Sequence, residues 1–486
     1  MTKNTDAYWA KMAATVEAEL MERVPENKLR PRLEPTRRAV ELMGDPQRSY
    51  RVIHITGTNG KTSTTRFIER ILREHGLRTG RFTSPHLVQM TERIAIDGEP
   101  VSDQVFYEVW QDTKHVLEIV DAELRAQGDS RLTFFEALAI LGFAIFADAP
   151  VDVLVLEVGM GGLWDSTNVA DGDVAVFTPI GIDHVDRLGH TLTEIADTKA
   201  GIIKPGALVV SAAQDSEARV VLEDRAAKIA DEFVSYGDRF RVTQSEIEGY
   251  GQRFNVQGLA AEYKDLFIPI LGAYQVENAA LAIASVEAFL GGGTLAITDD
   301  VLRVAIADAS SPGRLQILSR EPLLVLDAAH NPQGAQVLGQ AIAEVFSKQT
   351  FVGVVSVLAE KDARAILRTL EQSLAEIIIT KSDSPRAIAV EELAELAEEI
   401  FGEHRVRTAY TAQQGLAQAF DMISDGVVDA IVVSGSITLV GEVLKLQQTK
   451  SDLLANDDDY DEADDVNHDE FDGTNGIDED EEYEDE

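Results

Sequence analysis

Short runs of β-branched and aliphatic residues alternate along the chain with longer stretches of helical periodicity. The runs lie at residues 51–56, 151–158, 173–178 and 207–212, and again at 323–327, 351–357, 376–380 and 429–434. Continuous apolar runs of this length are typical of strands buried on both faces, which helices such as 63–75 and 134–147 would cover. The pattern therefore predicts an α/β fold with mostly parallel sheets.

The segment SSPGR at residues 310–314 separates the two series of strands, and its proline and glycine are typical of a linker or a sharp turn. We therefore expect a mononucleotide-binding domain at residues 1–308 and a smaller Rossmann-like α/β domain at 309–449. Residues 252–269 are expected to be extended, near the end of the first domain. A cleft between two such domains is a common place for substrates to bind.

The end of the 486-residue chain differs sharply in composition from the rest. Residues 451–486 hold 19 of the 84 acidic side chains and no lysine or arginine, which leaves a net charge of −22 on the first 450 residues. A dense block of like charge with few apolar residues predicts a disordered acidic tail at 450–486. The acidic body argues against a nucleic-acid-binding protein, which requires a basic face.

Composition also bears on the cellular location. The chain has no cysteine, which excludes disulfides and thiolate metal sites. No apolar run approaches the length that spans a bilayer, and residues 1–30 lack the apolar core of a signal peptide. We expect a cytoplasmic, monomeric protein that acts on small molecules, without nucleic-acid or membrane partners.

The most informative local motif is ITGTNGKTS at residues 55–63, where a strand runs into a glycine turn and then into a helix. Glycines let backbone N–H groups approach a phosphate chain, and the N-terminus of the following helix favours anions. The positive charge of Lys61 would lie beside the β and γ phosphates, and Thr62 is at the position where a hydroxyl often reaches Mg²⁺. The standard pattern G-x-x-x-x-G-K-[ST] requires a glycine where this chain has Ile55, so the match is incomplete.

A second glycine-rich segment, GMGGLW at residues 159–164, is similar to the dinucleotide-binding pattern G-x-G-x-x-G. Trp164 stands where the third glycine of that pattern allows helix and strand to pack closely. We therefore do not expect NAD or FAD to bind there.

Ten motifs resemble, in order, those of the folylpolyglutamate synthase / dihydrofolate synthase family, relatives of the Mur cell-wall ligases. They lie at residues 56–63, 83–87 (TSPHL), 133–136 (TFFE), 156–169, 181–184 (GIDH), 199–204 (KAGIIK), 274–279, 312–314 (PGR), 327–332 (DAAHNP) and 434–442. Each motif alone is weak, but ten in order are highly specific. The resemblance implies a ligase in which a substrate carboxylate attacks the γ-phosphate of ATP, and the amine of L-glutamate then displaces phosphate from the acyl phosphate.

The resemblance also implies roles for individual residues. Nucleotide contacts are expected from Thr58, Asn59, Gly60, Lys61, Thr62, Asn278, Arg314 and Asp327. One Mg²⁺ is expected at Ser84, Glu157 and His184, and a second at Lys199, whose family counterpart is carbamylated and therefore anionic. His330 is expected near the γ-phosphate, where it would support the developing charge. Without the resemblance, Glu157 could as well pair with a lysine or an arginine.

The resemblance places the folate or pteroate pocket at a third group of residues. These are Phe134, Phe135, Leu163, Trp164 and Asp165. Two adjacent aromatic residues in an apolar helix are, however, also typical of a hydrophobic core. Leu163 stands where the family commonly has arginine, and loss of that donor would alter the recognition of the pterin. In the second domain, Lys361 and Ser436 are expected to help bind the incoming glutamate.

Two other functions remain open at this point. A Mur-type ligase for another carboxylate acceptor would share the chemistry, but such ligases usually carry a further N-terminal domain, and only about 50 residues precede the phosphate loop here. A nucleotide-binding scaffold that acts through its acidic tail would not require the charged residues assigned above. Deletion of residues 451–486 would separate a docking role of the tail from the solubilising role that we favour.

Overall fold

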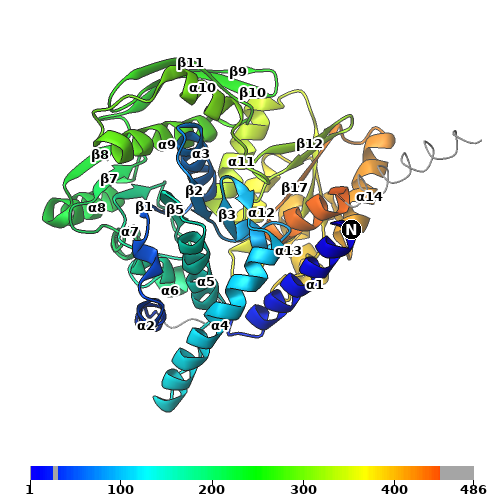
Figure 1. Ribbon diagram of the computed structural model, residues 1–486. Helices are drawn as coiled ribbons and strands as arrows, with labels where there is room; N and C mark the ends of the chain where they lie inside the picture. Colours follow the sequence, from blue (N-terminus) through cyan, green and yellow to red (C-terminus); the bar gives the residue numbers. More distant parts are fainter. Residues whose placement is uncertain (1, 26–30, 449–486) are drawn as a thin grey trace, which may run out of the picture.

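The computed structural model describes residues 2–25 and 31–448, and it has two α/β domains that lie side by side (Figure 1). This arrangement confirms the predicted fold class. The predicted acidic tail at 450–486 lies outside the described residues. None of the described helices is long and apolar enough to cross a membrane.

The first domain is built on an eight-stranded sheet in the order β4-β3-β2-β5-β1-β6-β7-β8. Its strands are β1 (Arg51–Thr56), β2 (Thr79–Phe82), β3 (Ile94–Ile96), β4 (Glu99–Pro100), β5 (Val153–Glu157), β6 (Val174–Phe177), β7 (Leu208–Ser211) and β8 (Glu232–Ser235). The strands from β2 to β8 in this order are parallel, whereas β3 and β4 add an antiparallel edge. The four predicted runs of the first half all form strands at the centre of the parallel part.

Both faces of this sheet are buried, which explains the continuous apolar runs. Ile53 and Val155 belong to one core, whereas Val52 and Leu154 belong to the core on the opposite face. Helices α3 (Lys61–Glu74), α9 (Ala273–Gly291) and α10 (Asp299–Ala307) supply the first core. Helices α1 (Thr2–Met21), α2 (Glu34–Leu42), α4 (Asp103–Ala126) and α5 (Phe134–Asp148) supply the second. Helices α7 (Leu192–Ala200) and α8 (Ser216–Ile229) cover β6 and β7.

Helix α5 begins at the TFFE motif, and the structure gives this motif a structural role. Thr133 accepts a hydrogen bond from the backbone N–H of Glu136, and the Glu136 carboxylate accepts one from the N–H of Thr133. This capping box satisfies backbone donors that the first helical turn leaves without partners. Arg32 holds the same carboxylate through an ion pair of 2.9 Å.

A small antiparallel sheet extends the first domain at the top of Figure 1. It consists of β9 (Arg241–Glu248), β10 (Gly251–Gln257) and β11 (Glu262–Ile268), in the order β11-β10-β9. The segment 252–269, predicted to be extended, forms most of β10 and β11.

The second domain is built on a six-stranded sheet in the order β12-β13-β17-β14-β15-β16. Its strands are β12 (Gln316–Arg320), β13 (Leu323–Leu326), β14 (Phe351–Val355), β15 (Glu376–Ile379), β16 (Val406–Thr408) and β17 (Ala430–Ser434). Only β12 is antiparallel to its neighbour. The helices are α11 (Pro332–Val345), α12 (Ala363–Glu371), α13 (Val390–Phe401) and α14 (Ala412–Ser424). Loops at the carboxyl ends of parallel strands commonly carry ligand sites, and those of β1, β5, β6 and β13 meet between the domains.

Candidate active site

A cavity between the two domains is lined by these loops. The structure brings together there a set of residues that the sequence assigned to nucleotide and metal: Thr58, Asn59, Gly60, Lys61, Thr62, Ser84, Glu157, His184, Lys199, Asn278, Arg314, Asp327 and His330. Because the first domain supplies the phosphate loop and the second supplies Arg314, Asp327 and His330, the site is complete only when the domains are together.

The phosphate loop connects β1 to α3 and requires its glycines. Gly57 has a φ of +148°, and a Cβ atom there would lie 1.9 Å from the side chain of Thr178. Gly60 has a φ of +86°, and a Cβ atom would lie 2.7 Å from the Asn278 side chain. The loop therefore packs tightly against Thr178, which follows β6, and against Asn278 of α9, so its backbone has little conformational freedom.

Lys61 lies at the first position of α3, and its side chain turns back over the loop. Its ammonium donates hydrogen bonds to the carbonyl oxygens of Gly57 and Thr58, at 3.2 and 3.0 Å. Burial lowers the pKa of Lys61, while the nearby carboxylates of Glu157 and Asp183 oppose that shift. The ammonium and the helix N-terminus together form a site suited to a phosphate chain.

Glu157 ends β5 and faces the same loop. Its side chain is buried, and both carboxylate oxygens accept from the hydroxyl of Thr62, at 3.0 and 3.1 Å. Burial raises the pKa of Glu157 to about 7, although the charge of Lys61 and the hydrogen bond from Thr62 oppose the shift. A bound cation would relieve this cost of burying a carboxylate.

The side chains around Glu157 fit a magnesium ion only if hydroxyl groups and water complete the set. In the described part of the chain, no three His, Cys, Asp or Glu side chains come together as a metal cluster. Ser84, Thr62 and His184 nevertheless line the cavity with Glu157. The His184 side chain is 36% exposed, and desolvation at the wall of the cavity lowers its pKa, so its imidazole is neutral and able to bind a metal. Magnesium usually retains several waters and takes one or two carboxylates from the protein, which this donor set allows.

Lys199 lies near the end of α7 and is buried. Its ammonium donates a 2.7 Å hydrogen bond to the carbonyl of Gly57, the same carbonyl that Lys61 contacts. Burial, followed by the charge of Lys61, lowers the pKa of Lys199 to about 7. A large fraction of this amine is therefore uncharged at neutral pH.

The second domain contributes a short segment after β13. The buried carboxylate of Asp327 accepts from the backbone N–H groups of Leu315 and Ala329, at 2.8 and 2.9 Å, and so joins the linker to this segment. The Nδ1 atom of His330 donates to the carbonyl of Ala328, at 2.8 Å. Burial lowers the pKa of His330 to about 4, so the imidazole is neutral until a nearby phosphate favours the charged form.

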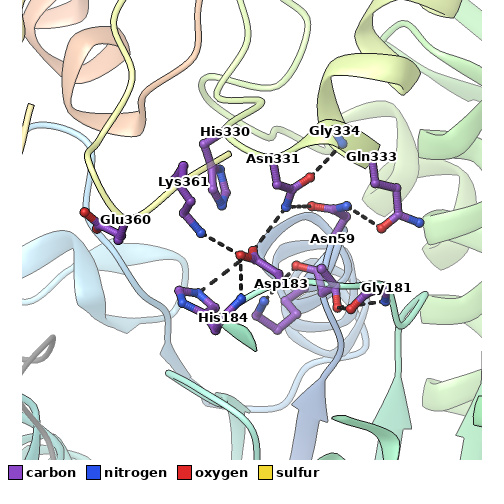
Figure 2. A network of polar contacts seen from close by, with 12 residues as sticks. Asn59, Gly181, Asp183, His184, His330, Asn331, Gln333, Gly334, Glu360 and Lys361 are labelled. Atoms are coloured by element: carbon purple, nitrogen blue, oxygen red, sulfur yellow. Dashed lines mark hydrogen bonds and ion pairs between the residues drawn. The ribbon is translucent and has the colours of Figure 1, made fainter. Parts of the chain in front are cut away.

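Polar contacts cross from one domain to the other beside His330 (Figure 2). Asn331 donates to Asn59 of the phosphate loop and to Asp183, each at 3.2 Å. Asn59 donates to Gln333, at 2.9 Å, and Lys361 donates to Asp183, at 2.8 Å. Sequence reasoning did not assign Asp183, Asn331 or Gln333 to the site. The only available signal was that Asp183 precedes His184 and that Asn331 and Gln333 follow His330 within three residues.

The residues predicted to bind folate or pteroate do not line this cavity. Phe134 and Phe135 belong to the core beneath α5, with 6% and 5% of their surfaces exposed. Asp165 is buried and accepts from the backbone N–H groups of Met160 and Thr167, so it holds the loop after β5. Trp164 packs against the core under α7, whereas Leu163 is 51% exposed. Their proposed contact with the acceptor stays a prediction.

The two residues expected to bind glutamate lie at the cavity or near it. Lys361 pairs with Asp183, and Ser436 precedes Ile437, which lines the cavity. The Ser436 hydroxyl is buried and has no hydrogen-bond partner in residues 2–25 and 31–448.

Comparison with known proteins agrees with this geometry. Residues 55–286 match the Mur ligase middle domain, and residues 313–437 match the Mur ligase, glutamate ligase domain. The chain is 42% identical to dihydrofolate synthase/folylpolyglutamate synthase of Mycobacterium tuberculosis over 88% of this chain and 90% of that protein. This chain belongs to the dihydrofolate synthase/folylpolyglutamate synthase family.

Other members of this family extend the similarity. The corresponding protein of Bacillus subtilis is 33% identical, over 76% of this chain and 85% of that protein. The M. tuberculosis folylpolyglutamate synthase structure with ADP and AMPPCP has a TM-score of 0.86 at 40% identity, covering 90% of this chain and 99% of that chain. An FPGS–AMPPCP–folate complex has a TM-score of 0.76 at 31% identity, covering 89% of this chain and 98% of that chain. The family resemblance predicted from the ten motifs is therefore confirmed.

Proposed function

We propose that this protein is an ATP-dependent ligase that adds L-glutamate to tetrahydrofolates, to dihydropteroate, or to both. The observation that carries the proposal is the interdomain cavity, in which a phosphate loop with Lys61 faces Glu157, Lys199 and His330. Relatives with the folylpolyglutamate synthase and dihydrofolate synthase names support the choice of acceptors. The first domain, up to residue 308, would bind ATP, and the second, from residue 309, would complete the site.

The residues of the cavity would divide the reaction between them. The start of α3 and Lys61 would bind the phosphates of ATP and hold the γ-phosphate for attack by the acceptor carboxylate. His330, protonated when a phosphate lies beside it, would stabilise charge on the transferring group. Ser84, Glu157, His184 and a carbamylated Lys199 would hold Mg²⁺, which supplies positive charge to the phosphates when it is bound. The amine of glutamate would then displace phosphate from the acyl phosphate.

The test of this function is phosphate release from ATP in the presence of Mg²⁺ and L-glutamate. Dihydropteroate, tetrahydrofolate and no acceptor are compared, and the products are identified by mass. A glutamate-dependent mass gain on either acceptor supports the proposal and shows which substrate is used. No gain on either, with AMPPCP still bound, would contradict it and point to a Mur-type ligase for another acceptor, with the exposed Leu163 as the first residue to replace by arginine.

Carbamylation of Lys199 predicts that activity depends on dissolved CO₂. Carbon dioxide adds to an uncharged amine and releases a proton. Because the pKa of Lys199 is about 7, the uncharged amine is available at neutral pH and becomes scarce as the pH falls below 7. We expect turnover to fall by at least an order of magnitude in CO₂-free buffer and to recover when bicarbonate is added, because the second metal position is lost without the carbamate. Phosphate release at pH 6.5, 7.5 and 8.5 measures this, and mass spectrometry of the native protein detects the added group. Rates that are indifferent to CO₂ at every pH would exclude the carbamate.

A further inference from the structure

Asp183 connects the two domains beside the phosphate loop. It lies in the loop between β6 and the short helix α6 (Val185–Leu188), and one oxygen accepts from Lys361 at 2.8 Å while the other accepts from Asn331 at 3.2 Å. Only 12% of the Asp183 side chain and 8% of the Lys361 side chain are exposed. The pair is therefore partly shielded from water, where an ion pair is stronger and where loss of one partner is costly.

Asp183 also holds the turn that presents His184. The backbone N–H of His184 donates to the Asp183 carboxylate at 2.8 Å, and His184 itself has left-handed backbone angles, with φ of 52° and ψ of 40°. This conformation costs free energy for a residue other than glycine, and the hydrogen bond to Asp183 helps to hold it. The same carboxylate thus binds the second domain and fixes the backbone of a residue that faces the cavity (Figure 2).

The contact with Asn331 extends the connection into the phosphate loop. The side-chain amide of Asn331 donates to both Asp183 and Asn59, and its oxygen caps α11 by accepting from the N–H of Gly334 at 2.7 Å. Because Asn331 directly follows His330, the contacts that hold Asn331 also restrain the backbone of His330. The N-terminus of α11, the phosphate loop and the β6–α6 loop are therefore held in one arrangement.

We propose that Asp183 is a positioning residue for the ligase reaction: by binding Lys361 and Asn331 it holds the second domain against the phosphate loop, and it fixes the turn that presents His184. This inference rests on the proposed ligase function. It assigns the charge of Lys361 to domain closure, in contrast to the expected contact of Lys361 with glutamate. Burial would raise the pKa of Asp183, but the charge and the hydrogen bond of Lys361 keep it well below its usual range, so the carboxylate stays charged.

The test is a double-mutant cycle with Asp183→Asn, Lys361→Met and the double variant. Asparagine retains one oxygen for the His184 N–H, although its NH2 group can no longer accept from Asn331, and methionine retains the packing of the lysine stem. The coupling between the two substitutions therefore measures the ion pair. We expect each single variant to lower kcat about tenfold through misplacement of the second domain, and the double variant to lose no more than the worse single variant. Lys348→Met, an exposed change in the same domain, should leave kcat unchanged. Multiplicative losses, or a Lys361→Met effect confined to the KM for glutamate, would overturn the proposal.

A second measurement reports closure without turnover. Hydrogen exchange of residues 357–362 is compared with AMPPCP bound to the wild type and to Asp183→Asn. We expect faster exchange in the variant, because the Lys361 loop is no longer held. Equal exchange would contradict the closure role even if the ligase is active, whereas inactivity of the wild type on both acceptors would contradict only the proposed function.

Discussion

Replacement of Lys61 by alanine is expected to reduce turnover by about a thousandfold. The ammonium lies over the phosphate loop at the start of α3, hydrogen-bonded to two carbonyls of that loop. Its removal takes away the positive charge that the loop itself presents to the β and γ phosphates, in a buried site where such a charge is strong. Phosphate release with a saturating acceptor and L-glutamate measures the loss.

The control for this variant is Lys228→Ala, which removes an exposed lysine from α8. It should retain wild-type turnover. Both variants should unfold with a midpoint close to that of the wild type, which would show that they are folded. The affinity for AMPPCP, measured by calorimetry, separates binding from chemistry. Wild-type kcat in Lys61→Ala would show that the loop does not act on the transferring phosphoryl group.

The central strands could be predicted because strands that are buried on both faces appear in the sequence as continuous apolar runs. All eight predicted runs are strands of the two mostly parallel sheets, with bounds that differ from the structure by at most two residues at either end. The edge elements could not be predicted in this way. Strands β3 and β4 have three and two residues, too few for a pattern to be distinguished from a loop. Helix α1 buries only a narrow stripe, which includes Ala13, Val16 and Leu20. Because the rest of the segment is mostly polar, its sequence did not indicate a helix.

The nucleotide side of the site was more predictable than the acceptor side. A phosphate loop is continuous in sequence, so the positions of Lys61 and Thr62 follow from the strand and helix on either side of them. The acceptor residues depend on tertiary packing instead. In the TFFE segment, Thr133 and Glu136 begin a helix, and both phenylalanines turn into the core.

Contacts between the domains could not be predicted from the sequence, for a simpler reason. Asp183 and Lys361 are 178 residues apart, and nothing in the local sequence around either residue indicates that the other is its partner. Asn331 precedes Pro332, a pair of residues that is typical of a turn. In the structure Asn331 instead has an extended backbone and begins α11, and its side chain both caps that helix and reaches the phosphate loop.

Replacement of Glu157 by glutamine is expected to lower turnover by about a hundredfold and to abolish the stabilisation by Mg²⁺. The folded-state pKa is raised from 4.5 to about 7, so the folded protein binds this proton more tightly than the unfolded chain does. Without a metal, the free energy of unfolding should therefore fall as the pH rises from 4.5 to 7, by roughly 3 kcal/mol. Glutamine carries no proton to lose, so the variant should not show this fall.

Unfolding temperatures measured from pH 4.5 to 8, in EDTA and in Mg²⁺, distinguish the metal role of Glu157 from a structural one. In the wild type Mg²⁺ should raise the unfolding temperature most above pH 7, where the carboxylate is charged and gains most from a cation. The control is Glu287→Gln on α9: burial raises the pKa of this carboxyl too, but its partners are Tyr263 and backbone N–H groups of the β10–β11 turn. That variant should keep the full Mg²⁺ response. A Glu157→Gln protein that Mg²⁺ stabilises as much as the wild type would show that the ion binds elsewhere and that the buried carboxylate serves only to hold Thr62.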